Sequence, residues 1–147
     1  MKLRFAIIVT SVLAILPSAH AADRAVVLVT SRDCAMDTII ALDIRKAYLG
    51  IVVSYEGHVI RPFGLSNDEQ LNQIFFQYVV AMSKKTYERR LLRLLIQHGQ
   101  PRPREFDVVA DLVAAVTENP CSIAYMWQSD AEAWTSIKAI KNLWQEN

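Results

Sequence analysis

Six polar residues at the ends of apolar runs are best placed to bind a ligand. The first run ends in Ser31, the second ends near Leu65, and the third ends at Trp127. Ligands of open α/β sheets gather outside the carboxyl ends of the strands. We therefore predict a ligand-binding set made of Thr30, Ser31, Ser66, Asn67, Gln128 and Ser129. Caps and turns use the same residue types, and that structural role is the alternative.

Catalytic and metal-binding patterns do not emerge from the sequence. His58 and His98 lie far apart and lack the spacing of metal ligands. No Ser-His-Asp or Cys-His arrangement can be assembled from the chain with a structural reason behind it. We expect a non-enzymatic protein with no catalytic residues, no metal site and no cofactor.

The stretch from Phe63 to Phe76 predicts the end of a strand followed by a helix. A helix N-terminus presents free amide groups and about half a positive charge, which suits an anion. Here Asp68 and Glu69 fall in the expected first turn, where their carboxylates favour the helix dipole and repel an incoming phosphate. The same carboxylates could instead attract a cationic ligand or a basic partner surface.

Apolar periodicity predicts an α/β domain with a small, mostly parallel sheet flanked by helices. Continuous or β-branched runs predict strands, of which the second, weakened by Pro62, is expected near an edge. Stripes at helical spacing predict helices, including one capped by Ser83 in which Leu91, Leu94 and Leu95 face inward. The expected strands cover 24–31, 59–63 and 121–127, and the expected helices cover about 40–50, 68–82, 83–98 and 108–117.

The sequence after Trp127 is compatible with either a helix or a strand. Ser129 and Glu132 form a capping-box pattern, and Trp134, Ile137 and Ile140 could extend one helical stripe. The residues from Thr135 to Trp144 could equally form an edge strand.

Cys34 and Cys121 are the two cysteines of the chain. If the strands are parallel, Cys34 follows the carboxyl end of one strand and Cys121 precedes the amino end of another. Five strand residues span about 17 Å, whereas bridged Cα atoms usually lie within about 7 Å. We therefore expect no disulfide unless the polar crossing after Ser31 folds back.

The N-terminus has the pattern of a secretory signal. Lys2 and Arg4 precede the apolar run Phe5–Leu16, and a small-x-small site ends at Ala21. As a helix this run rises about 18 Å, too little for a hydrocarbon layer of about 30 Å. We expect cleavage after Ala21, a periplasmic protein that is not an integral membrane protein, and one domain over residues 22–147.

Charge distribution bears on the partners. The formal net charge is +1, so nothing demands nucleic acid. Basic residues cluster between 84 and 104, where they suit either a solvated helix face or a docking patch for an acidic protein or anionic lipid head groups. The members are Lys84, Lys85, Arg89, Arg90, Arg93, Arg102 and Arg104.

Several motifs together resemble the phosphate-type periplasmic substrate-binding proteins. The stretch "DIRKAYLG" (43–50) is similar to a helix of that family, "YEGHVIRPFGL" (55–65) to its aromatic hairpin, and "NPCSIAYM" (119–126) to a strand with its preceding turn. Between them, "FFQYVVAMS" and "GQPRPREF" resemble family segments in the same order. The resemblance covers nearly all of the chain after the signal and implies a single lobe of the type II fold, with Ser136–Leu143 as an extended closing segment.

Full-length members of that family bind an oxyanion between two lobes, and this chain has the length of one. The family turn reads roughly "EGS", where this sequence has Asn67, Asp68 and Glu69, and Gly64 stands near the place of a family arginine. The favoured hypothesis is therefore a binding module that recognises a small solute or a membrane or periplasmic protein at the carboxyl edge of its sheet. The alternative is an oxyanion-binding transport component that dimerises to complete its cleft.

Overall fold

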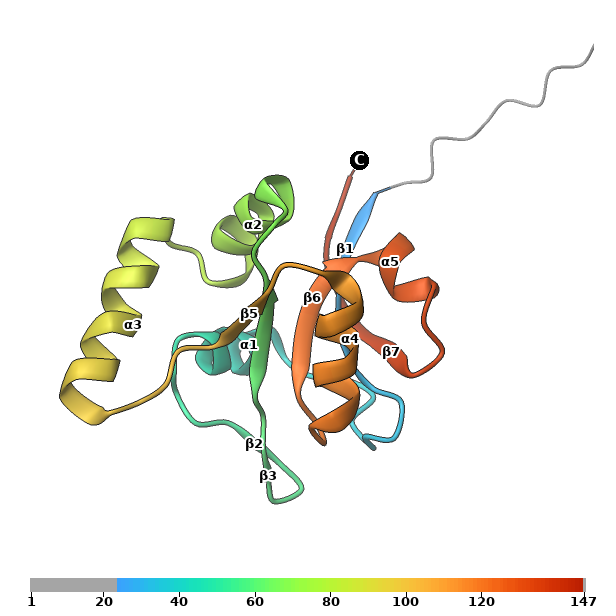
Figure 1. The fold of residues 1–147 in the computed structure, drawn as a ribbon, viewed down its shortest axis with the longest axis horizontal. Helices are drawn as coiled ribbons and strands as arrows, with labels where there is room; N and C mark the ends of the chain where they lie inside the picture. Colours follow the sequence, from blue (N-terminus) through green and yellow to red (C-terminus); the bar gives the residue numbers. More distant parts are fainter. Residues whose placement is uncertain (1–23, 147) are drawn as a thin grey trace, which may run out of the picture.

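A computed structural model describes residues 24–146, so the predicted signal sequence lies outside the described residues. Figure 1 shows a central sheet with helices packed around it and α3 at one side of the molecule. The five-stranded sheet has the order β5-β4-β6-β1-β7, and β2 and β3 form a separate hairpin. The strands are β1 Ala25–Ser31, β2 Ser54–Tyr55, β3 His58–Val59, β4 Pro62–Leu65, β5 Arg104–Phe106, β6 Ile123–Trp127 and β7 Ile137–Gln145. The helices are α1 Ala41–Tyr48, α2 Glu69–Ile74, its π-helical continuation η1 Phe75–Val79, α3 Lys84–His98, α4 Val109–Glu118 and α5 Gln128–Glu132.

The α/β class is confirmed, but the sheet is mixed. Strand β4 runs parallel to β5 and β6, whereas β1 is antiparallel to both β6 and β7. Four of the five strands therefore point the same way, as a mostly parallel sheet requires, and β1 alone runs against them, since an apolar run shows that a strand is buried without showing its direction. Strand β4 lies second from the edge, next to β5, so its expected place near an edge is confirmed. Pro62 is its first residue, a position where a missing amide donor is tolerated.

The core contains a cluster of aromatic side chains between the sheet and its helices. Phe75 stacks on Tyr125 with ring centroids 4.4 Å apart, and Tyr48 packs edge-on against Phe75 at 4.9 Å. The Tyr48 hydroxyl donates to the Phe63 carbonyl at 2.8 Å, and the Tyr87 hydroxyl donates to the Tyr48 carbonyl at 2.9 Å. Burial raises the pKa of Tyr48, Tyr87 and Tyr125 above the ordinary value.

Helix α3 begins as predicted and packs differently from the prediction. Ser83 caps it, since its Oγ accepts a hydrogen bond from the Thr86 amide at 3.2 Å. The buried residues of α3 are Tyr87 and Leu91, whereas Leu95, expected to face inward, is 42% exposed. A peripheral helix needs only a narrow buried stripe, so three leucines at helical spacing overestimate what it buries.

The C-terminal segment is extended, as the resemblance implied. Strand β7 occupies residues 137–145, in agreement with the closing extended segment and against a helix. The preceding helix α5 begins at Gln128 after Trp127, so Ser129 lies inside it and is not its cap. The capping-box prediction is wrong, because the helix starts directly from the end of β6.

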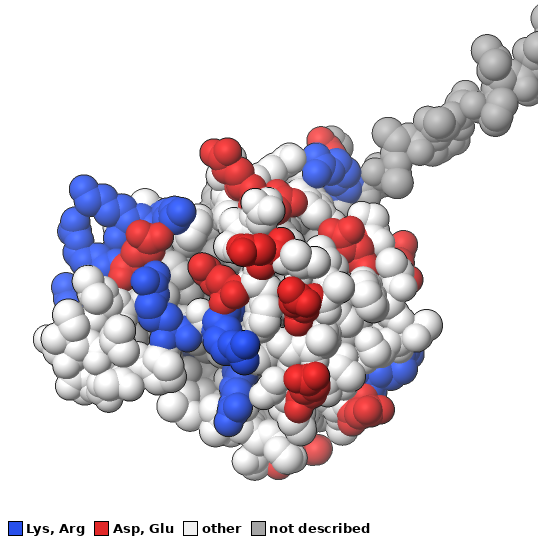
Figure 2. All heavy atoms as spheres, viewed as in Figure 1, with Lys and Arg blue, Asp and Glu red and all other residues white. Residues whose placement is uncertain are grey.

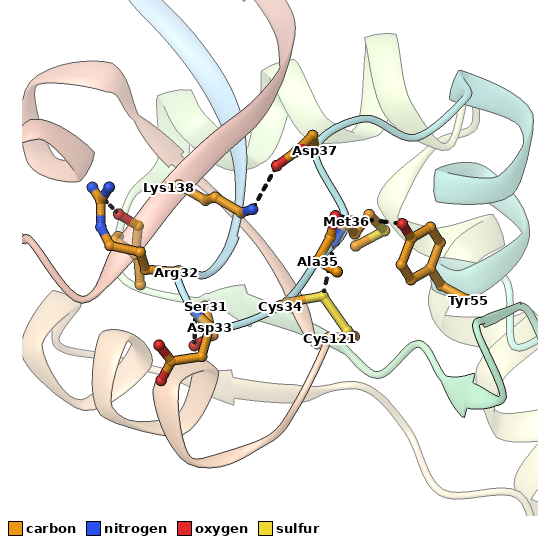
Figure 3. A network of polar contacts seen from close by, with 11 residues as sticks. Ser31, Arg32, Asp33, Cys34, Ala35, Met36, Asp37, Tyr55, Cys121 and Lys138 are labelled. Carbon is orange, nitrogen blue, oxygen red and sulfur yellow. Dashed lines mark hydrogen bonds and ion pairs between the residues drawn. A yellow bond between two sulfur atoms is a disulfide. The ribbon is translucent and has the colours of Figure 1, made fainter.

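Cys34 and Cys121 form a disulfide with a Cα–Cα distance of 5.2 Å. The expectation that they do not pair is wrong. Because β1 is antiparallel to β6, the end of β1 and the beginning of β6 meet at the same end of the sheet. Figure 3 shows the disulfide beside the polar contacts of the segment that leaves β1, including the Lys138–Asp37 ion pair at 2.6 Å. Such cross-links are typical of proteins outside the cytoplasm.

Candidate functional site

The structure divides the six predicted ligand-binding residues between the two ends of the sheet. Thr30 and Ser31 end β1 beside the disulfide, and both are buried. The Thr30 hydroxyl donates to the Ser122 carbonyl at 2.7 Å, and the Ser31 hydroxyl accepts from the Asp33 amide at 3.3 Å. These two hydroxyls therefore have internal structural partners and lie away from the other four residues.

The remaining four residues share the carboxyl edge of the parallel strands β4 and β6. Ser66 and Asn67 follow β4, and Gln128 and Ser129 follow β6. The Ser66 amide donates to the Phe106 carbonyl at 2.9 Å, and its hydroxyl bonds to the Asp107 carboxylate. Ser66 thus fastens its turn to the end of β5, while the Asn67 side chain is exposed.

Asp68 occupies the N-terminus of α2. It is the N-cap residue rather than a member of the first turn, and its Oδ1 accepts from the Leu71 amide at 2.9 Å. Its Oδ2 accepts from the Trp127 Nε1 at 2.6 Å, which joins the turn after β4 to the end of β6. A carboxylate of the chain itself therefore occupies the position where an oxyanion would meet the helix amides.

A cavity of about 480 Å³ is lined in part by Trp127, whose indole donates to this carboxylate. Gln128 and Ser129 are among its lining residues, together with Arg24, Ala25, Trp127, Asp130 and Glu132.

Arg24 is the one basic residue of that lining. Its guanidinium lies 4.1 Å from the centre of the Trp127 ring, and its Nη1 donates to Gln70 Oε1 at 2.9 Å. On the other side of the cavity, the Gln128 amide donates to Glu132 Oε1 at 2.7 Å. Asp130 adds a second carboxylate to the lining, so with the nearby Asp68 the acids outnumber the single cation.

Sequence reasoning missed the roles of Arg24 and Trp127. Trp127 was predicted at the end of a strand and was not assigned to the ligand-binding set, although an aromatic side chain at the carboxyl end of a strand can form one wall of a cavity. Arg24 gave no signal, because its contact with Trp127 depends on β1 running antiparallel to β6, which pairs Val26 with Trp127.

Charge is segregated on the surface. Figure 2 shows Lys and Arg gathered over α3 and the segment that follows it, and Asp and Glu gathered over α2, α4 and the region near α5. Within α3 one exposed ion pair forms, between Lys84 and Glu88 at 3.9 Å. The basic cluster is thus a solvent-facing surface, as both of its interpretations require.

Solved structures that are similar to this chain include phosphate-transport proteins. An ABC-type phosphate transport receptor from Vibrio cholerae matches 81% of this chain over 46% of its own length, with a TM-score of 0.59 and 10% identity. A phosphate-bound structure from Clostridium perfringens, named as a phosphate ABC transporter substrate-binding protein, matches 81% of this chain over 45% of its length, with a TM-score of 0.60 and 15% identity. The chain has the fold of one lobe of these binding proteins.

The likeness covers only part of each matched structure. PstS from Borrelia burgdorferi matches 76% of the chain over 43% of its own length, with a TM-score of 0.51 and 14% identity. The chain thus spans about half the length of the structures that it matches. No protein-family model and no curated protein matches it at a significant level.

Two findings concern the whole described lobe. Among residues 24–146, no helix has the length and apolar character needed to cross a membrane. In the same range, no group of three or more His, Cys, Asp or Glu side chains could hold a metal ion.

Proposed function

We propose that this protein is a non-enzymatic periplasmic binding module that recognises a small solute or a protein partner at the carboxyl edge of its sheet. The observation that carries the proposal is the Asp68 carboxylate at the N-terminus of α2. The fold of a binding-protein lobe is combined here with a helix end that is already occupied by an acid. We infer that the recognised group is basic rather than an oxyanion.

Electrostatics at the cavity supports a basic ligand. Two unit charges 4 Å apart interact by about 4 kcal/mol at the effective dielectric constant of a protein surface. Asp130 and Glu132 line the cavity, so a phosphate entering it would meet repulsion of this order, while an ammonium or guanidinium group would be attracted. The guanidinium of Arg24 over the Trp127 ring supports this proposal, because it is an internal example of the cation–π contact that a basic ligand would make.

The periplasmic location rests on two independent features. The N-terminus has the charge, apolar run and small residues of an export signal. The disulfide between Cys34 and Cys121 is of the kind that forms outside the cytoplasm.

Thermal melts of the oxidised mature chain test the proposal. A ligand that binds the native state raises the midpoint according to RT ln(1 + [L]/Kd). We expect millimolar arginine, putrescine or spermidine to raise it, and phosphate, sulfate or molybdate at the same ionic strength to leave it unchanged. The Asp130→Asn/Glu132→Gln variant should lose the response to cations. A rise with an anion and none with a cation would contradict a basic ligand.

A second candidate function is an oxyanion-binding component of a transport system. The Clostridium perfringens structure, which contains bound phosphate, favours it. A single lobe would then need a second copy to complete the cleft. Stoichiometric heat of phosphate binding, together with a phosphate-dependent dimer in sedimentation velocity, would support this candidate against the first.

A further inference from the structure

An apolar groove lies at the opposite end of the strands from the candidate site. Its volume is about 410 Å³. Pro62 and Arg104, the first residues of β4 and β5, line it, so it opens at the amino ends of these strands. Its other walls come from the end of α1, the β2–β3 hairpin and the segment between α3 and β5.

Large apolar side chains around this groove are unusually exposed. Val52 is 73% exposed, Val59 is 51% exposed and Ile51 is 45% exposed. Single exposed apolar residues are ordinary, but several of them around one depression mark an interaction surface.

The charges of the groove have one sign. Arg61, Arg102 and Arg104 line it, and none of its lining residues is acidic. Within residues 24–146 no ion pair engages any of these three arginines. Arg61 reaches the Asn119 side chain at 3.4 Å, and Arg104 lies 5.1 Å from the centre of the Phe106 ring, so their positive charges remain available to a carboxylate. Arg102 and Arg104 are also members of the basic cluster between residues 84 and 104.

The backbone around the groove is held in place before any partner arrives. Pro101 and Pro103 restrict the segment between α3 and β5. The Gln100 side chain donates to the Gly50 carbonyl, which ties this segment to the end of α1. A surface fixed in this way loses little conformational entropy on binding.

We propose that this groove binds an extended segment of a partner protein in which acidic residues flank apolar side chains. The apolar residues of the segment would cover Val52 and Val59, and its carboxylates would pair with the three arginines. A small solute is a poorer match, because sites for small molecules enclose 70–90% of the ligand. Here the apolar walls stay about half exposed, which suits a chain that passes across the groove and continues beyond it.

Selection from a random dodecapeptide phage library on the immobilised oxidised chain tests the proposal. We expect enriched sequences with Asp or Glu beside Leu, Ile, Val or aromatic residues. The Val52→Asp/Val59→Asp variant should bind a selected peptide with an affinity lower by on the order of tenfold or more. Val108→Asp is the matched control, because Val108 is 53% exposed and lies just after β5, away from the groove lining. It should leave binding unchanged, and circular dichroism and melting confirm that each variant is folded.

Charge reversal gives the sharper readout. An Arg102→Glu/Arg104→Glu variant should lose the acidic peptides and enrich basic ones in a fresh selection. Amide shifts in ¹⁵N spectra should move in the segments that line the groove and not in the turn after β4.

Four results would overturn the proposal. The first is a selection that enriches no peptide, and the second is a selection whose enriched peptides stay the same after charge reversal. The third is that peptide binding shifts amide signals at the carboxyl edge. The fourth is that no peptide is selected while the chain binds phosphatidylethanolamine–phosphatidylglycerol vesicles and the Val52→Asp/Val59→Asp variant does not.

Discussion

Removing the disulfide tests the polarity of β1. We consider the double substitution Cys34→Ala/Cys121→Ala. The two cysteines are separated by 87 residues, and the loop-closure relation for a cross-link of that size gives about 4.5 kcal/mol of stabilisation at 25 °C. Native disulfides measured by removal contribute about 2–5 kcal/mol, so we expect a loss within that range. Domains are stable by only about 5–15 kcal/mol, which makes this a large fraction of the total.

Urea unfolding followed by circular dichroism measures the loss. With a slope near 2 kcal/mol per molar urea, a loss of about 4 kcal/mol lowers the midpoint by roughly 2 M. Wild-type protein in a reductant is the matched control, because it keeps both sulfur atoms and loses only the cross-link. It should unfold close to the double variant, and any difference between them measures the packing of the two buried sulfurs.

The refuting result is specific. If oxidised and reduced wild-type protein unfold at the same urea concentration, or if the folded protein offers two titratable thiols, the cysteines do not pair. The antiparallel placement of β1 against β6 would then lose its strongest covalent support, since only that placement brings the end of β1 to the beginning of β6.

Three further perturbations test other parts of the structure. Asp68→Ala should lower the free energy of unfolding by about 2–4 kcal/mol, because it removes both the helix cap and the acceptor of the Trp127 indole, and a loss below about 1 kcal/mol in urea would contradict this joint role. Burial raises the pKa of three tyrosines, so above pH 10 the unfolded chain releases protons that the native state keeps, and stability should fall by about 1.4 kcal/mol per pH unit for each. In urea titrations above pH 10 the fall of stability with pH should be smaller by one such contribution in the Tyr125→Phe variant, and an unchanged dependence on pH would argue against burial of that phenol. Gly50→Ala should destabilise more than Gly99→Ala: both glycines have positive φ, but an added Cβ at Gly50 would lie 2.7 Å from a leucine side chain of α3, whereas nothing lies within 4 Å of one at Gly99. Equal losses in thermal melts would refute that contact.

Local pattern was sufficient for much of the fold. The Ser83 cap is confirmed, and it depends on residues close together in the chain, where capping chemistry acts directly. The extended tail is confirmed as the resemblance implied, whereas apolar spacing alone left both a helix and a strand open there. The short strand β5 was not predicted, because its residues Arg104–Phe106 gain strand character only by pairing with β4.

Strand direction was not available from local pattern. Alternating strands and helices favour a parallel sheet, but the apolar pattern of a buried strand is the same whether the strand runs parallel or antiparallel to its neighbours. The direction of β1 was therefore wrong, and this accounts for two other errors. It set Cys34 and Cys121 apart, and it placed Thr30 and Ser31 at the carboxyl edge with Ser66 and its neighbours, whereas they lie at the other end.

The two ends of the sheet are fastened by different chemistry. At the carboxyl edge the link is a hydrogen bond, from the Trp127 indole to the Asp68 carboxylate, which a competing charged group can weaken. At the amino edge the link is covalent. Cys121 follows Asn119, a residue of the groove lining, by two positions, and the Tyr55 hydroxyl ties the β2–β3 hairpin to the segment beside Cys34 through the Ala35 carbonyl at 3.4 Å. Figure 3 shows this contact between Tyr55 and Ala35 near the disulfide. Because the cross-link acts on the amino end, reduction should loosen the groove more than the carboxyl edge.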